Sequence, residues 1–453
     1  MGHYLFSSKE VDELLENYND HPNLFPSQKL ENVHIWDETL RDGEQSPGVF
    51  LTTDEKIEIA KMMDEIGIKM AAVGFPAVSS GERDSVSAIV HEGFSNLKIL
   101  GIARPRESDI NECLACELTD IVIFLPISDL AMKIYNLTPE GELKQMEKAI
   151  QYAQDHGLRV NWVSEDSSRA SPEHLHNVFQ KAVDLDVERI VLSDTVGTLF
   201  PQTTAHLVNQ IFDKIKLNGC EVGFHGHNDF GLATSNTVNA VLHGVTYPHT
   251  CINGYGERAG NAAFEEVVLN LERLNIETGI KLEKIFELSQ LTERCFGLPI
   301  APNKAVIGNN AFSHESGLHI NAILAHPQSY EPINPKSVGR QRQYYIGKFS
   351  GSGAIVNALK TKLNIFNFDP PQHLIRDVVE EIKRSCDTSD KQEHNEIFNQ
   401  IKTLIGQITA GVTDKEFYEI VRKILGKYAK EDWSRVIEEK MKEKDHGPPK
   451  NAD

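Results

Sequence analysis

Two histidines separated by a single glycine, His225 and His227, are the residues of this 453-residue chain that are best suited to chemistry. In an extended strand, residues i and i+2 point to the same side, so these two imidazoles would face one point in space. The intervening glycine lets the backbone approach closely, and neutral imidazoles are common ligands of divalent metals. Asn228 and Asp229 follow, which indicates a strand that ends at a loop. The motif alone fits either a metal site or two surface histidines.

The composition is that of an ordinary globular protein, with 40% hydrophobic and 25% charged residues. The net charge of −20 disfavours nucleic-acid binding, because neutralising phosphates takes clustered lysine and arginine. A local basic or metal-centred pocket could still hold a small anion. Neither a membrane span nor a signal peptide is indicated by the sequence pattern. The six scattered cysteines predict reduced thiols. We therefore expect a cytoplasmic protein with no nucleic-acid and no membrane partner.

From residue 33 onward, short apolar runs alternate with amphipathic stretches of helical length. The predicted strands are Val33–Trp36, Met70–Val73, Leu97–Gly101, Ile121–Phe124, Val160–Val163, Ile190–Leu192, Val222–Phe224 and Thr250–Asn253. The predicted helices are Thr53–Ile66, Gly81–His91, Glu107–Glu117, Pro139–His156, Pro172–Leu185, Pro201–Leu217, Gly231–Leu242 and Asn261–Leu274. Eight strand–helix units over about 245 residues favour a closed parallel (β/α)8 TIM barrel. The alternative, a doubly wound open sheet, usually carries a glycine-rich loop after its first strand, and no such loop follows Trp36.

The predicted fold is therefore α/β, a TIM barrel followed by a small α/β linker subdomain and a helical C-terminal region. We expect an N-terminal helical lead-in at 1–30, the barrel at 31–280 and the linker subdomain at 281–365. A helical C-terminal domain follows at 366–445, with helices at 374–386, 393–408, 414–428 and 433–443, and then a disordered tail at 446–453.

Catalytic residues of TIM barrels lie at the C-terminal ends of the strands. Asp42 follows the first strand, and His225 and His227 end the seventh, so the three meet across the closing seam. They form a plausible three-ligand metal site with open positions for water and substrate, and Asn261 could add an oxygen directly or through water. Arg41, beside Asp42, would place a fixed cation where an enolate or alkoxide charge develops.

The alternative for charged residues at strand ends is a set of structural ion pairs. We expect that simpler role for Asp37 and Asp166. For Arg41 and the three candidate metal ligands taken together, we favour the catalytic interpretation, because all of them come from strand ends that meet at one face of the barrel.

Three spaced motifs resemble one enzyme family. They are Asp-Glu-Thr-Leu-Arg-Asp-Gly-Glu-Gln at 37–45, His-Gly-His-Asn-Asp at 225–229 and Gly-Tyr-Gly-Glu-Arg-Ala-Gly-Asn at 254–261. The chain resembles the acetyl-CoA-dependent 2-oxo acid condensing enzymes over roughly residues 33–350. This group comprises the 2-isopropylmalate, homocitrate, citramalate and Re-type citrate synthases.

The resemblance implies an acyltransferase that joins acetyl-CoA to a 2-oxo acid by Claisen condensation. A base removes a methyl proton from acetyl-CoA, the enolate attacks the 2-oxo carbon, Arg41 stabilises the charge, and water cleaves the thioester. The implied metal is Mn²⁺ first, with Mg²⁺ or Zn²⁺ as alternatives, and its implied ligands are Asp42, His225 and His227. The partners implied are acetyl-CoA, a small 2-oxo acid and a second copy of the chain.

The resemblance also assigns roles to further residues. His319 and Tyr330 match acid–base residues of a subdomain that reaches into the partner's barrel, which implies a homodimer with a domain-swapped linker subdomain. The expected catalytic residues are Arg41, Glu165, His319 and Tyr330, and the expected substrate-binding residues are Arg41, Glu44, Asn161, Thr195 and Glu257.

Several departures from the family bear on the 2-oxo acid. Asn161 stands where homocitrate synthases carry arginine, Ala131 where isopropylmalate synthases commonly carry histidine, and Ala72 where relatives usually have glutamate. Phe349 also replaces a usual histidine, and the helical region after residue 365 does not resemble the regulatory domain of isopropylmalate synthases. These departures favour a short oxo diacid, with oxaloacetate first, which would make the protein a Re-type citrate synthase. The alternatives are 2-oxoisovalerate and 2-oxoglutarate.

Two other classes of protein stay open. A metal-dependent acyl-CoA lyase or aldolase would keep Arg41 and the metal ligands but would not need His319 and Tyr330. A non-catalytic binding protein would be expected to have lost a metal ligand or Arg41, and the chain carries all of them.

Overall fold

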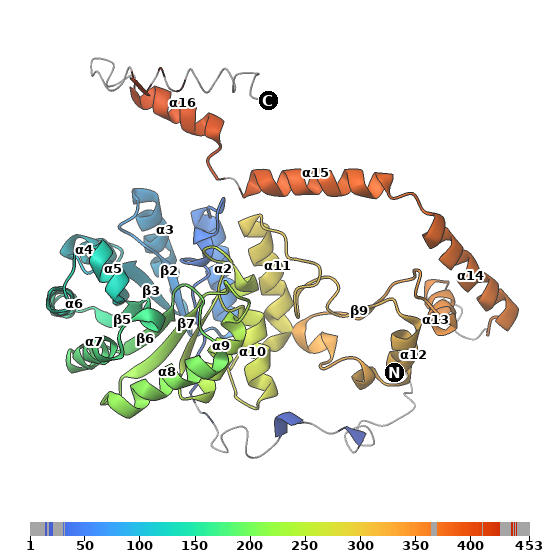
Figure 1. Ribbon diagram of the computed structural model, residues 1–453, viewed down its shortest axis with the longest axis horizontal. Helices are drawn as coiled ribbons and strands as arrows, with labels where there is room; N and C mark the ends of the chain where they lie inside the picture. Colours follow the sequence, from blue (N-terminus) through green and yellow to red (C-terminus); the bar gives the residue numbers. More distant parts are fainter. Residues whose placement is uncertain are drawn as a thin grey trace, which may run out of the picture. The chain divides into compact units, whose positions relative to one another are not determined.

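Eight parallel strands close into a barrel in their sequence order, as the strand–helix alternation predicts. The structure is a computed structural model that describes residues 14–15, 18–20, 30, 32–363, 369–409, 411–425, 436–437, 439 and 441. The predicted helical lead-in at 1–30, the predicted helix at 433–443 and the predicted tail at 446–453 lie wholly or mainly outside the described residues. Figure 1 shows the strands enclosed by the helices that connect them.

The barrel strands are β1 (Trp36–Asp37), β2 (Met70–Gly74), β3 (Lys98–Ala103), β4 (Asp120–Pro126), β5 (Arg159–Glu165), β6 (Arg189–Asp194), β7 (Glu221–Gly226) and β8 (Tyr247–Thr250). β1 pairs with both β2 and β8, which closes the ring. The predicted position of the eighth strand was wrong by three residues. Its real sequence is polar, because Tyr247 and His249 face into the barrel, and a left-handed φ of 62° at Asn253 ends the extended backbone beyond it.

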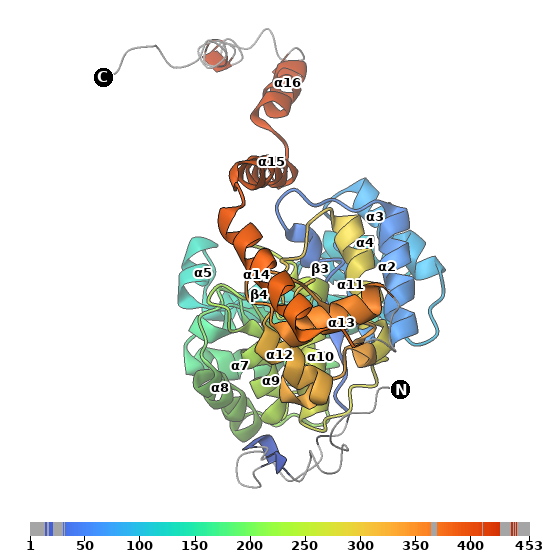
Figure 2. The same ribbon diagram turned by 90° about the vertical axis from the view of Figure 1, so that its right-hand side faces the viewer.

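The connecting helices are α2 (Thr53–Ile66), α3 (Ser80–His91), α4 (Glu107–Ala115), α5 (Asp129–Ile134), α6 (Pro139–Asp155), α7 (Pro172–Asp184), α8 (Pro201–Lys214), α9 (Ala233–Leu242) and α10 (Phe264–Arg273). Local signals explain where several begin. Thr52 and Glu55 form a capping box at α2, and proline opens α6, α7 and α8. The short α5 was not predicted. Figure 2 shows helices on every side of the strands.

The barrel interior is packed rather than open. Its apolar cluster consists of Trp36, Met70, Ala72, Leu100, Ile102, Val122, Val191 and Tyr247, with Phe75, Phe124 and Val163 against it. Arg189 lies at the N-terminal end of the barrel, where it bonds Asn161 over 3.1 Å, Tyr247 over 3.0 Å and Glu221 over 2.5 Å. A buried ionic network and an apolar layer therefore close the lower part of the barrel, which leaves the C-terminal ends of the strands for the site.

After the barrel come α11 (Ile285–Phe296), a two-stranded parallel sheet of β9 (Ser313–His314) and β10 (Gln343–Tyr344), and helices α12 (Gly317–Ala325) and α13 (Ser352–Lys362). Helices α14 (Gln372–Thr388), α15 (Gln392–Ile408) and α16 (Asp414–Leu425) follow, which confirms a helical C-terminal region. The chain divides into two compact units, residues 47–49 with 392–453 and the remainder. Within the described residues, no helix has the length and apolarity needed to cross a bilayer.

Candidate active site

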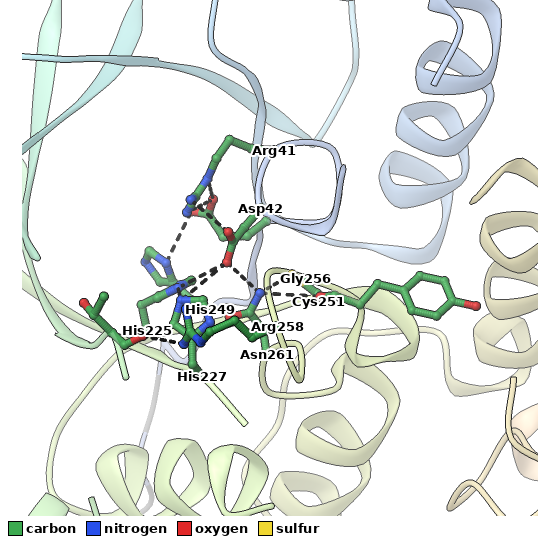
Figure 3. Close-up of polar contacts among 12 residues, drawn as sticks. Arg41, Asp42, His225, His227, His249, Cys251, Gly256, Arg258 and Asn261 are labelled. Atoms are coloured by element: carbon green, nitrogen blue, oxygen red, sulfur yellow. Dashed lines mark hydrogen bonds and ion pairs between the residues drawn. The ribbon is translucent and has the colours of Figure 1, made fainter. Parts of the chain in front are cut away.

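Three side chains converge at the C-terminal end of the barrel and form a candidate metal site. Asp42 lies in the turn after β1, His225 lies on β7, and His227 follows β7 directly. The two histidine Nε2 atoms are 3.2 Å apart, and they lie 3.5 and 3.7 Å from Asp42 Oδ2. All three residues are buried, and one donor atom from each lies within 4.8 Å of the others. Figure 3 shows the three side chains pointing at one another.

Asn261 completes one side of this cluster. Its Nδ2 donates to Asp42 Oδ2 over 2.6 Å, with longer contacts to Cys251 Sγ and the carbonyl of Tyr255. Its Oδ1 is buried and has no hydrogen-bond partner. The Nδ1 atom of His227 is also buried without one. Two imidazoles, a carboxylate and an unpartnered amide oxygen are a donor set that fits a divalent cation such as Mn²⁺, Mg²⁺ or Zn²⁺.

The protonation of the cluster suits metal binding. Burial would raise the pKa of Asp42, but Arg41, His225 and His227 outweigh burial and hold that pKa well below its usual range. Burial and the neighbouring His225 lower the pKa of His227 to about 3. A carboxylate that stays ionised and an imidazole that stays neutral are the forms that bind metals.

Arg41 lies beside the cluster and is held by two carboxylates. Its Nε and Nη2 lie 2.7 and 2.6 Å from Glu38 Oε2, and its Nη1 lies 3.4 Å from Asp42 Oδ1. Glu38 Oε1 in turn faces His249 Nδ1 at 3.3 Å. Glu38 occurs in the first motif and His249 on the eighth strand, but neither was predicted as a site residue. The signal that could have identified His249 is its place as an inward-facing polar residue near the C-terminal end of a barrel strand.

A cavity of about 280 Å³ opens beside the cluster. Apolar side chains from β2 to β5 form one half: Phe75, Ile102, Val122, Phe124 and Val163. Polar side chains from the first strand and from β5 to the loop after β8 form the other half: Glu38, Arg41, Asp42, Gln45, Glu165, Ser193, Thr195, His225, His227, His249, Glu257 and Arg258. Ser193 Oγ is buried and has no hydrogen-bond partner, so this half offers a free hydroxyl to a ligand.

The predicted catalytic residue Glu165 lines the cavity, and so do three of the predicted substrate-binding residues, Arg41, Thr195 and Glu257. Burial and the adjacent Asp166 raise the pKa of Glu165, which keeps a carboxyl group available for proton transfer.

Glu44 and Asn161, which were also predicted to bind substrate, point into the protein instead of lining this cavity. Glu44 pairs with the buried Lys56 over 2.6 Å and accepts the backbone N–H of Leu51 over 2.8 Å. Asn161 is fully buried in the lower barrel, where it donates to the carbonyl of Ile121. Neither residue is among those that line the cavity. The reason for Asn161 is its register, because it stands two inward-facing positions below Glu165 on β5.

Two acidic residues have the structural roles expected of them. Asp166 accepts hydrogen bonds from Arg169 Nε and Nη2 over 2.7 and 2.8 Å and from the hydroxyl of Ser128 over 2.5 Å. Asp37 is buried and accepts the backbone N–H of Thr39 at 2.8 Å. These contacts fix the turns after β1 and β5 rather than facing the cavity.

His319 and Tyr330 lie together in the linker subdomain. Their rings stack with centroids 4.0 Å apart. Next to Tyr330, the buried Glu331 forms an ion pair with Arg342 and lies 3.7 Å from His314 Nε2. Among the described residues, the cavity lining includes neither His319 nor Tyr330. The predicted acid–base pair is thus assembled, but apart from the metal cluster of its own chain.

Two known family models match consecutive parts of the chain. The HMGL-like family model matches residues 32–292, and the homocitrate synthase post-HMGL domain-like model matches residues 306–390. The first match ends within α11, and the second contains His319 and Tyr330.

Curated relatives match over most of the chain. A homocitrate synthase AksA of Methanopyrus kandleri is 38% identical over 87% of this chain and 93% of its own length. A 2-isopropylmalate synthase and an (R)-citramalate synthase CimA of Methanocaldococcus jannaschii are 39% and 38% identical, over 95% and 90% of this chain and 77% of each relative. An HMG-CoA lyase structure from Bacillus subtilis shares the fold at a TM-score of 0.55 and 20% identity, over 61% of this chain and 96% of that one.

Proposed function

The chain belongs to the metal-dependent, acetyl-CoA-using family of 2-oxo acid condensing enzymes, and we propose that it catalyses a Claisen condensation of acetyl-CoA with a small 2-oxo acid followed by thioester hydrolysis. The observation that carries this proposal is the convergence of Asp42, His225 and His227 with Arg41 at one end of the barrel. A barrel of this kind also occurs in lyases. The second matched region, at 306–390, favours a synthase.

The residues of the site have separable tasks in this reaction. A divalent cation held by Asp42, His225 and His227, with Asn261 beside them, would act as a Lewis acid toward the 2-oxo acid. Arg41 presents a fixed positive charge to the oxygen on which negative charge develops. Glu165, whose pKa is raised by burial and by Asp166, is suited to exchange a proton with the reacting groups.

Oxaloacetate is the 2-oxo acid that we propose first. The cavity is small, and its polar half offers the hydroxyls of Ser193 and Thr195 near Arg258 to a second carboxylate. The Ser193 hydroxyl has no other partner, and a buried polar group without one costs about 1–3 kcal/mol. The departures from the family at Ala131 and Ala72 also favour a short diacid.

A 2-oxo acid with a small apolar side chain, pyruvate or 2-oxoisovalerate, is the second candidate. The observation that favours it is the apolar half of the cavity, formed by Phe75, Ile102, Val122, Phe124 and Val163. 2-Oxoglutarate is less favoured, because Asn161 stands where homocitrate synthases carry arginine. Neither Asn161 nor the adjacent Arg189, which is paired with Glu221, lines the cavity.

The proposal extends to assembly. We propose a cytoplasmic homodimer in which His319 and Tyr330 of one chain serve as acid–base residues in the partner's barrel, with Mn²⁺ as the resident metal. Neither residue of the stacked pair lines the cavity of its own chain, which supports completion of the site by a second chain.

Steady-state assays with acetyl-CoA, Mn²⁺ and each of oxaloacetate, pyruvate, 2-oxoisovalerate and 2-oxoglutarate test the proposal. We expect the highest kcat/KM with oxaloacetate and release of free CoA. Good turnover of another acid beside negligible turnover of oxaloacetate would refute the substrate assignment. Release of CoA with none of the four acids would refute the reaction class for this panel.

A further inference from the structure

The contacts of Arg41 are strongly asymmetric. Both its Nε and its Nη2 lie within 2.7 Å of one Glu38 oxygen, whereas its nearest contact with Asp42 is 3.4 Å long. An arginine beside a carboxylate normally binds it closely, because the guanidinium presents parallel donors to the two oxygens. Here Glu38 occupies that edge of Arg41. Asp42 Oδ2 therefore faces Asn261, His225 and His227 rather than Arg41.

His249 holds Glu38 from the other side. Its ring stacks on Trp36 with centroids 4.3 Å apart, and its Nδ1 lies 3.3 Å from Glu38 Oε1. Both Glu38 and His249 are 2% exposed, so little of either side chain is in contact with bulk solvent. A Cβ at Gly223 would lie 3.3 Å from His249 Nε2, so the missing side chain at 223 leaves room for the ring. Glu38 thus has a neighbour at each of its oxygens, Arg41 at Oε2 and His249 at Oε1.

We propose that Glu38, supported by His249, is a positioning residue that binds the guanidinium edge of Arg41 and so keeps this cation away from the metal-binding oxygen of Asp42. Without the charge of Glu38, Asp42 is the carboxylate left to balance Arg41, and a guanidinium bound to Asp42 competes with a metal for the same oxygens. With Glu38 in place, Arg41 stays close enough to act on the substrate and Asp42 stays free to bind the metal. The inference rests on the metal site of the proposed function.

The test is a double-mutant cycle read by Mn²⁺ titration calorimetry, with no substrate present. Glu38→Gln keeps the shape of the side chain and removes its charge, and we expect the dissociation constant for Mn²⁺ to rise roughly 10- to 100-fold. In an Arg41→Met background, the same Glu38→Gln change should leave Mn²⁺ affinity unaltered, because the competing cation is gone. His249→Phe retains the stacking on Trp36 but removes Nδ1, and a smaller loss in the same direction is expected.

Glu221→Gln is the matched control. Glu221 also pairs with a buried arginine, Arg189, and lies on the same strand as His225 but at the other end of the barrel. We expect this variant to bind Mn²⁺ like the wild type. An equal loss of affinity in Glu38→Gln with and without Arg41, or an equal loss in Glu221→Gln, would overturn the inference in favour of a general charge effect.

The remaining outcomes separate this inference from the proposed function. Unchanged Mn²⁺ affinity in Glu38→Gln overturns the inference and leaves the metal site intact. A wild-type protein that binds no divalent metal overturns both. If the Mn²⁺ affinities follow the expected double-mutant cycle but the protein condenses none of the 2-oxo acids, the inference is supported and only the proposed reaction is refuted.

Discussion

Asn261 Nδ2 donates a 2.6 Å hydrogen bond to Asp42 Oδ2, which joins the loop after β8 to the turn after β1. The two residues are 219 positions apart in the sequence, and both are at most 3% exposed. A bridge between His227 and Asn261 ties the same loop to β7. The contact therefore orients the carboxylate of Asp42 before any metal binds, and it leaves the amide oxygen of Asn261 unpartnered beside it.

Replacing Asn261 with alanine should weaken metal binding without unfolding the barrel. The variant loses both the hydrogen bond to Asp42 and a potential oxygen ligand, so we expect Mn²⁺ affinity to fall roughly 10- to 100-fold. Titration calorimetry measures it. Asn236→Ala is the matched control. Asn236 lies on α9, is also buried, and donates a 2.8 Å hydrogen bond to the carbonyl of Leu199. Similar Mn²⁺ affinities for the two variants would contradict the role of Asn261.

Replacing His227 with alanine should abolish activity and stoichiometric metal binding together. The side chain supplies one of three converging donors, and its low pKa keeps the imidazole unprotonated at neutral pH. Chelation of the wild type should cause the same loss, reversible by adding Mn²⁺. His206→Ala, on the exposed face of α8, is the control. Full activity of His227→Ala, or of the chelated wild type, would refute the metal assignment.

Much of this fold can be predicted from local sequence patterns, such as apolar periodicity and helix-capping residues. Alternating apolar runs and capped helices predict the barrel and the ends of α2 to the residue, because capping and burial are local. The histidine pair is likewise readable, since the period of a strand puts both rings on one side. The positions of Glu44 and Asn161 outside the cavity lining depend on tertiary contacts as well. Glu44 pairs with Lys56 on α2, and Asn161, two inward-facing positions below Glu165, meets Arg189 of β6.

The roles of Glu38 and His249 could not be read from spacing either. Glu38 directly follows β1 and His249 lies on β8, two strands that are distant in sequence and adjacent across the closing seam. The relevant information is which oxygen of Glu38 faces which neighbour. An eighth strand made of Tyr, Pro, His and Thr carries little apolar signal. Of its inward-facing residues, Tyr247 bonds Arg189 in the lower barrel and His249 lines the cavity. These polar roles hide the strand from pattern analysis.

Mixed dimers should reveal whether the linker subdomain completes the partner's barrel. His227→Ala and His319→Ala homodimers are each expected to be inactive. After subunit exchange, a domain-swapped heterodimer has one site with both an intact barrel and an intact linker, so roughly a quarter of all sites recover activity. If each linker served its own barrel, every site would retain a defect. Absence of recovery, with exchange verified by native mass spectrometry, would therefore contradict the swap.

Replacing Gly223 with alanine should destabilise the barrel and impair the site. The added Cβ would lie 3.0 Å from Val191 Cγ2, 3.2 Å from the carbonyl oxygen of Tyr247 and 3.3 Å from His249 Nε2. The carbonyl belongs to a paired strand and cannot move freely, so His249 must give way. We expect a cost of about 1–3 kcal/mol in the free energy of unfolding, measured by urea denaturation. Gly81→Ala on α3, where φ is not left-handed and a Cβ meets only Ser79 Oγ at 3.9 Å, controls for the substitution itself. An equal effect of both changes would contradict the packing argument.

The ion pair between His174 and Glu142 should make stability depend on pH. His174 Nε2 lies 2.5 Å from Glu142 Oε2, which joins α7 to α6, and the hydrogen bond to Glu142 raises the pKa of His174 despite its burial. Because the folded-state pKa is raised, this contribution is fully present below the unfolded value near 6.5 and is lost as pH rises through the folded value. Thermal unfolding of the wild type and His174→Gln at pH 6 and pH 9 tests it. We expect the wild type to exceed the variant in Tm by more at pH 6 than at pH 9, since the imidazolium forms the charged pair only at the lower pH. A gap that is equal at both values, or wider at pH 9, would contradict a protonated His174 in the folded state.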